Sequence, residues 1–185
     1  MLYLLTKNRN KYEEIAELCK ASNLELLMLP DDKIELQADT LEEVARYAAE
    51  QAYSKHNKPV IVDDSGLFID ALNGFPGVYT SYVKKTIDSK GILRLMDGVS
   101  NRAAYFKTVI AYADSDRIEL FEGIVRGMIA DSVHSGRDFG FDNIFIPEGY
   151  NKTFSELSIE EKNSISHRAR AFNSFLSFYK GLVYK

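Results

Sequence analysis

The feature that most constrains the fold is a regular alternation of strand-like and helix-like segments over the first third of the chain. Its hydrophobic pattern predicts a strand, a helix, a strand, a helix and a strand, at residues 2–5, 12–19, 24–29, 41–56 and 60–63. Thr40 and Glu43 form a capping-box pattern directly before the second helix. Such alternation is typical of α/β folds, in which helices cover a sheet.

The middle of the chain has a different pattern. Residues 103–113 and 118–129 read as two long strands joined by the turn-forming sequence "DSD", which predicts an antiparallel hairpin. A short strand at 144–146 and a closing helix with an apolar face follow. We therefore expect a mixed α/β fold with a long central mixed β-sheet, flanking helices and two lobes around a cleft. Residues 1–185 are expected to form a single domain.

Composition excludes several classes of protein. The net charge of −4 gives no overall basic field that would recruit nucleic acid, and no apolar run reaches the roughly 20 residues that a membrane span requires. The apolar stretch at the start of the chain is too short for a signal peptide. The single cysteine, Cys19, lies on the apolar stripe of the first helix, so we expect a core thiol and a cytoplasmic location.

The last predicted strand of this series ends on two adjacent carboxylates. Asp63 and Asp64 are followed by Ser65 and Gly66, and Asp, Ser and Gly all favour chain reversal. The alternative is a metal or phosphate site, because open α/β folds bind ligands at the carboxyl ends of their strands. This stretch alone leaves both interpretations open.

Four other segments carry residues suited to a nucleotide. The sequence "TKNRNK" lies where a strand passes into a helix, and a helix N-terminus with Thr6, Asn8 and Lys11 suits phosphate, although it also suits an ordinary cap. Glu35 is either a solvated loop acid or, with Asp64, half of a carboxylate pair for Mg²⁺.

The third segment, "FGFD", sets Phe139 and Phe141 two residues apart around Gly140. Two such aromatic residues in a strand point to one face and can stack on a purine, or they can be core residues. Further along, "SHR" contributes His167 and Arg168, which with Lys162 are either solvated or donors to a base.

Taken together, the motifs resemble the inosine triphosphate pyrophosphatase family, which removes non-standard purine nucleotides. The resemblance rests on five ordered blocks that span nearly the whole chain: Thr6-x-Asn8-x-x-Lys11, Asp63-Asp64-Ser65-Gly66-Leu67, Asn73-Gly74-Phe75-Pro76-Gly77, Phe139-Gly140-Phe141-Asp142 and Ser166-His167-Arg168. It implies hydrolysis of ITP, dITP and XTP to the nucleoside monophosphate and pyrophosphate, with Mg²⁺ as cofactor and a homodimer as the assembly.

The resemblance also implies roles for individual residues. Asp64 would accept a proton from the attacking water and bind Mg²⁺ together with Glu35, while Asp63 would support the turn. Substrate would be bound by Thr6, Lys7, Asn8, Arg9, Asn10, Lys11, Ser65, Phe139, Gly140, Phe141, Asp142, Lys162, His167 and Arg168.

Three positions depart from the family pattern. Phe141 stands where tryptophan or tyrosine is frequent, and Asn143 stands where proline is frequent. Ala48 replaces a lysine that many relatives carry on the second helix. The first two departures bear on selectivity and loop rigidity, and the third on phosphate coordination.

Other functions fit parts of the sequence. A phosphatase of the aspartyl-phosphate type would need a second acid two residues after the nucleophile, where Ser65 or Gly66 stands. A related pyrophosphatase for modified nucleotides and a non-enzymatic nucleotide-binding module are two more possible functions. The phosphorus product formed from ITP with Mg²⁺ separates these possibilities.

Overall fold

The computed structural model describes residues 2–33, 36–137 and 139–183 as a mixed α/β protein. Its six-stranded sheet has the order β2-β1-β3-β4-β5-β6. β1 runs parallel to β2 and to β3, whereas β6 runs antiparallel to β5. The mixed sheet and its helices confirm the expected fold class. No helix in the part of the chain that the structure describes is long and apolar enough to cross a membrane.

The chain divides into two compact units that are interleaved along the sequence. Three long strands, β3 (Val60–Ile69), β4 (Ala103–Ala113) and β5 (Ile118–Ile129), contribute residues to both units. Unit 1 comprises the described parts of Met1–Asp64, Thr108–Gly123 and His167–Lys185, and unit 2 comprises Ser65–Lys107 and Ile124–Ser166.

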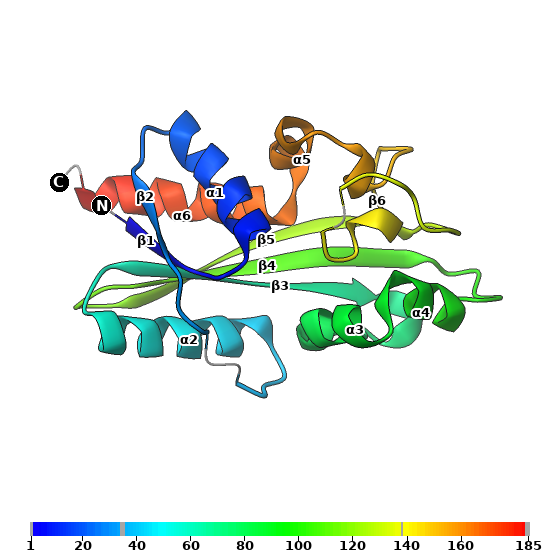
Figure 1. Ribbon diagram of the computed structural model, residues 1–185, viewed down its shortest axis with the longest axis horizontal. Helices are drawn as coiled ribbons and strands as arrows, with labels where there is room; N and C mark the ends of the chain where they lie inside the picture. The colour runs from blue at the N-terminus through cyan, green and yellow to red at the C-terminus, as the bar shows by residue number, and fades with distance from the viewer. Residues whose placement is uncertain (1, 34–35, 138, 184–185) are drawn as a thin grey trace. The chain divides into compact units, whose positions relative to one another are not determined.

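Unit 1 is a layered α/β structure. Besides the long strands it holds β1 (Leu2–Leu5), α1 (Arg9–Ala21), β2 (Leu26–Leu29), α2 (Leu41–His56) and α6 (His167–Val183). Figure 1 shows α1 and α6 on one side of the unit 1 strands and α2 on the other. The core between the sheet and α6 is largely aromatic, with the rings of Tyr112 and Phe175 5.8 Å apart.

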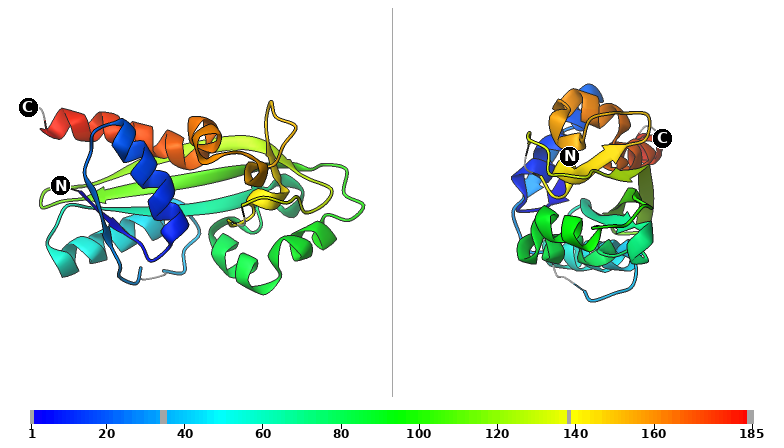
Figure 2. Two further views of the ribbon diagram at one scale, coloured as in Figure 1. Left: turned by 45° about the horizontal axis from the view of Figure 1, so that its top comes forward. Right: turned by 90° about the vertical axis from the view of Figure 1, so that its right-hand side faces the viewer.

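Unit 2 has a core of its own, built around Phe106, Phe145 and Phe154. Its further elements are α3 (Thr80–Thr86), α4 (Asp88–Leu95), β6 (Phe145–Pro147), α5 (Ile159–Ile165) and short 3₁₀ helices at Asp70–Leu72, Gly77–Tyr79, Asp142–Ile144 and Phe154–Glu156. The right-hand view of Figure 2 shows α3 and α4 on one side of the unit 2 strands and α5 on the other.

Most predicted elements are present, with one important difference. The capping box of Thr40 and Glu43 is formed, and both strands of the hairpin have the predicted bounds. The expectation that a strand ends at Asp63 is wrong, because β3 continues through Asp64, Ser65 and Gly66 to Ile69. The acidic pair therefore lies within a strand and not in a turn.

The beginning of α6 lies directly against β5. A Cβ atom built on Gly123 of β5 would overlap the carbonyl oxygen of His167 and the backbone nitrogen of Ala171. The absence of a side chain at Gly123 thus allows the first turn of α6, which carries Arg168, to approach the strand.

We predict that Gly123→Ala destabilises the protein by about 1–3 kcal/mol, because the added methyl group forces backbone to move. Gly181→Ala in α6 is the control, since nothing lies within 4 Å of a Cβ at that position. The free energy of unfolding, measured in urea, should fall only for Gly123→Ala. Equal stability of the two variants would show that α6 does not need this close approach.

Candidate active site

The junction between β1 and α1 is an N-terminal helix cap that also orders a lysine. Asn8 is the N-cap residue, and its side chain accepts a hydrogen bond from the backbone nitrogen of Lys11. Thr6 is buried after β1, where its hydroxyl accepts a hydrogen bond from the backbone nitrogen of Asn8 at 3.0 Å. Lys11 lies in the first turn of the helix, so the hydrogen bond to Asn8 fixes the position of its backbone.

The remaining residues of this loop are more exposed. Lys7 pairs with Asp32 at 2.6 Å, and Arg9 pairs with Glu13 one helical turn later. Asn10 is partly buried in the first turn of α1. Their roles in substrate binding stay predictions.

Asp63 belongs to a buried cluster of charges within unit 1. Its carboxylate pairs with Nε of Arg168 at 3.0 Å and with Nζ of Lys11 at 2.5 Å. Nη1 of Arg168 also donates to Glu14 at 2.5 Å. Arg168 and Glu14 are each only 1% exposed. Two carboxylates thus balance two cations, which is the condition under which buried charge is tolerated.

The electrostatics of this cluster keep its members charged. Burial by itself raises the pKa of Asp63, but the charges of Arg168 and Lys11 outweigh burial and hold that pKa below its usual value. Burial likewise lowers the pKa of Arg168, while Asp63 and Glu14 hold it above its usual value. Asp63 therefore stays ionised, and its ion pairs have a structural role.

Asp64 has different surroundings. Successive side chains of a strand point to opposite faces, so Asp64 points away from the face of Asp63. Its carboxylate forms an ion pair with the ammonium of Lys33, and its side chain is 14% exposed. Glu35, the other predicted metal ligand, lies outside the described residues.

The donors at Asp64 suit a magnesium ion. Among the described residues, no group of three or more His, Cys, Asp or Glu side chains is arranged to hold a metal. Mg²⁺ commonly needs only one or two protein carboxylates, since waters and substrate phosphates complete its shell. The Lys33 ammonium already places a cation against this carboxylate. The chemistry of Asp64 therefore fits the predicted cofactor.

Lys162 and the predicted base-binding residues from Phe139 to Asp142 lie in unit 2, whereas His167 and Arg168 belong to unit 1. Lys162 in the last turn of α5 pairs with Asp142 at 2.5 Å, and both side chains are buried. The Lys162 ammonium also lies 4.8 Å from the centre of the Phe139 ring, which is partly exposed. The structure thus brings an aromatic ring, a cation and a carboxylate together.

Two expectations about this loop need revision. Phe139 and Phe141 do not lie in a strand, because Gly140 adopts a left-handed conformation with φ +56° and turns the chain into a 3₁₀ helix. Phe141 is 0% exposed and packs in the core of unit 2. In this conformation its ring has no exposed face, so the stacking prediction rests on Phe139.

The other predicted residues and departures have clear places. Ser65 follows Asp64 in β3, and His167 is buried at the start of α6. Asn143 accepts a hydrogen bond from Ser89 at 2.6 Å, which connects the loop that carries Phe139 and Phe141 to α4. Ala48 is buried in α2 and brings no charge.

Sequence reasoning missed Glu14 and Lys33. Glu14 lies three residues after Lys11 and four before Leu18 in α1. Helical spacing therefore predicts that these three side chains share one face of the helix. Lys33 lies in a charged loop, where no local pattern indicates its pairing with Asp64.

Comparison with known proteins identifies the family. The sequence model of the Ham1 family matches residues 2–178, so the chain belongs to this family. It is 50% identical over 182 residues to the dITP/XTP pyrophosphatase of Saccharolobus solfataricus, covering 98% of this chain and 95% of that one.

Two solved structures have the same fold. A HAM1 protein from Coxiella burnetii matches with a TM-score of 0.86 and 30% identity over 97% of this chain and 98% of that one. The Ham1 protein of Staphylococcus aureus matches with a TM-score of 0.84 and 31% identity, covering 98% and 99% of the two chains.

We predict that Glu14→Gln lowers the free energy of unfolding by about 3 kcal/mol, because it leaves one positive charge of the buried cluster uncompensated. Glu13→Gln, the same change at the preceding, more exposed position, should alter stability by less than about 0.5 kcal/mol. Urea unfolding measures both. Indistinguishable stabilities would contradict the structural role of the Glu14–Arg168 pair.

Proposed function

We propose that this protein hydrolyses the non-standard purine nucleoside triphosphates ITP, dITP and XTP to the nucleoside monophosphate and pyrophosphate. Membership of the Ham1 family supports the proposal, as does 50% identity to a protein named dITP/XTP pyrophosphatase. Removal of such nucleotides would keep the cellular pool free of non-standard bases.

The observation that carries the proposal is the contrast between the two neighbouring carboxylates of β3. Asp63 is buried and paired with Arg168 and Lys11, whereas Asp64 is partly exposed and paired with Lys33. A general base has to reach water and substrate, which Asp64 can do and Asp63 cannot. Asp64 is therefore the residue that takes the proton from the water attacking the α-phosphorus.

The residues from Thr6 to Lys11 bind the triphosphate in this proposal. The N-terminus of α1 offers backbone N–H groups and the positive end of the helix dipole, both of which favour phosphate oxygens. Lys7 and Arg9 are exposed cations on either side of the N-cap residue Asn8. A bound Mg²⁺, held by Asp64 and Glu35, would offset the charge of the phosphates and lower the pKa of a bound water.

The second group of residues selects the base. Lys162, which lies beside Phe139 in unit 2, carries only donors, so its ammonium can pair with the carbonyl that hypoxanthine and xanthine have at the purine 6-position. Adenine has an amino group there, which would face a donor and leave both groups unpaired. Phe139 supplies stacking, which is equally favourable for every purine.

Three further properties complete the proposal. The family resemblance implies Mg²⁺ dependence and a homodimer. The single cysteine is consistent with a cytoplasmic location, where thiols stay reduced.

We predict that the purified protein with Mg²⁺ releases pyrophosphate from ITP and XTP, and that kcat/KM for ITP exceeds that for ATP by about 10²-fold or more. A mismatched, charged donor at the 6-position accounts for that ratio. The measurement is product identification by phosphorus NMR together with steady-state kinetics for both nucleotides. Orthophosphate as the first product would indicate a phosphatase, and binding of ITP without turnover would indicate a non-enzymatic module.

A further inference from the structure

Lys33 is the ion-pair partner of Asp64. Its ammonium contacts the Asp64 carboxylate, and the Lys33 side chain is 22% exposed. Lys33 belongs to the segment between β2 and α2, which is distant in sequence from β3. The contact therefore depends on how this segment is held in unit 1.

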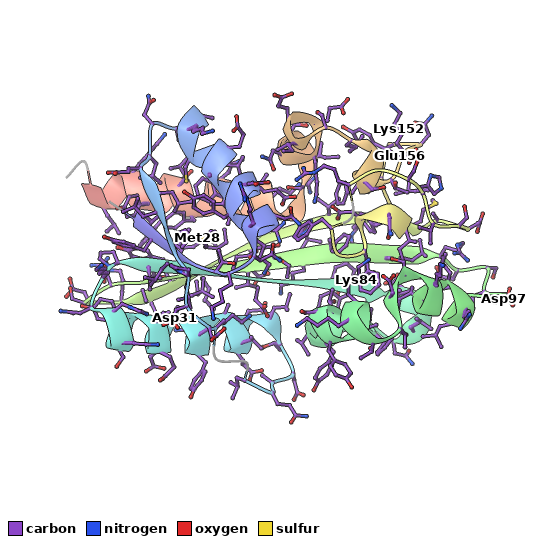
Figure 3. All side chains as sticks on the ribbon, viewed as in Figure 1. Met28, Asp31, Lys84, Asp97, Lys152 and Glu156 are labelled. Atoms are coloured by element: carbon purple, nitrogen blue, oxygen red, sulfur yellow. The ribbon has the colours of Figure 1, made fainter. Side chains whose placement is uncertain are left out.

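Two further ion pairs hold the residues just before Lys33. Asp31 pairs with Lys55 at 2.6 Å near the end of α2, and Asp32 pairs with Lys7 at 2.6 Å. Figure 3 shows Asp31 beside α2. Three consecutive charged residues thus contact three different parts of unit 1, and Lys33 is the one directed at Asp64. Its ammonium lies at the end of a long, flexible side chain.

An ammonium and a divalent cation compete for the same carboxylate. Both are attracted to Asp64, and they repel each other at short range. When Mg²⁺ binds Asp64, the ammonium of Lys33 therefore has to leave the carboxylate. If Asp64 activates water at the α-phosphorus, the nearest new anions are the phosphate oxygens of the substrate.

We propose that Lys33 is a substrate-binding residue that neutralises Asp64 before a metal binds and then moves to the triphosphate once the metal takes that carboxylate. This role rests on the proposed function. It makes Lys33 a competitor of the metal in the free protein and a partner of the phosphates in the loaded protein. Loss of its charge should consequently change two affinities in opposite directions.

Lys33→Met tests this pair of effects without turnover. Calorimetric titration with Mg²⁺ alone should show binding about 3- to 10-fold tighter than in wild type, because no ammonium competes for Asp64. Titration with inorganic tripolyphosphate at saturating Mg²⁺ should show binding about 10-fold weaker, the scale of one lost charge-assisted contact. Lys33→Arg, which keeps the charge, should stay near wild type in the second titration.

The control is Lys20→Met, which removes an exposed cation near the end of α1 that pairs with Glu17 and does not contact the segment of Lys33. It should leave both affinities within about twofold of wild type. Lys33→Gln, checked by thermal unfolding, provides a second neutral variant if Lys33→Met folds poorly. Equal affinities of wild type and the neutral variants, or weaker binding in both titrations, would overturn the role of Lys33. Absence of ITP hydrolysis by wild type would instead overturn the proposed function.

Discussion

The ion pairs of Arg168 with Asp63 and Glu14 are the interaction on which the site in unit 1 depends. They join the start of α6, the middle of β3 and the first turns of α1, three elements far apart in sequence. Charges this deeply buried are stable only when each has its partner, so the three elements can take up few other arrangements. Gly123 contributes by letting α6 lie close enough to β5 for Arg168 to reach them.

This cluster explains how two adjacent carboxylates can have different tasks. Alternation along a strand sends Asp63 and Asp64 to opposite faces, and each face has its own cations. Asp63 is kept anionic by fixed partners and belongs to the framework. Asp64 has a flexible partner, Lys33, which can be exchanged for a metal ion. Because fixed partners hold Asp63, the backbone at Asp64 keeps its position when the partner of Asp64 changes from Lys33 to a metal ion.

Much of the fold could be predicted from the sequence, because hydrophobic periodicity and caps are local signals. The Thr40 cap and the bounds of the hairpin strands are examples. The extension of β3 past Asp63 could not be predicted, because Asp64, Ser65 and Gly66 have the composition of a turn. The cation that compensates Asp64 is Lys33, which is distant in sequence. For Phe141 the sequence left stacking and core packing both open, because the two favour the same residue type, and the structure shows core packing. Glu35 stays a prediction.

The central claim is that Asp63 maintains the structure and Asp64 performs the chemistry. The most direct test is to measure ITP turnover and the free energy of unfolding for Asp63→Asn and Asp64→Asn. Asp64→Asn should lose about 10²-fold or more in turnover while its stability changes by less than about 1 kcal/mol, because its ion pair is partly exposed. Asp63→Asn should lose about 3–5 kcal/mol of stability. Near-normal turnover of Asp64→Asn at saturating Mg²⁺ would contradict the account.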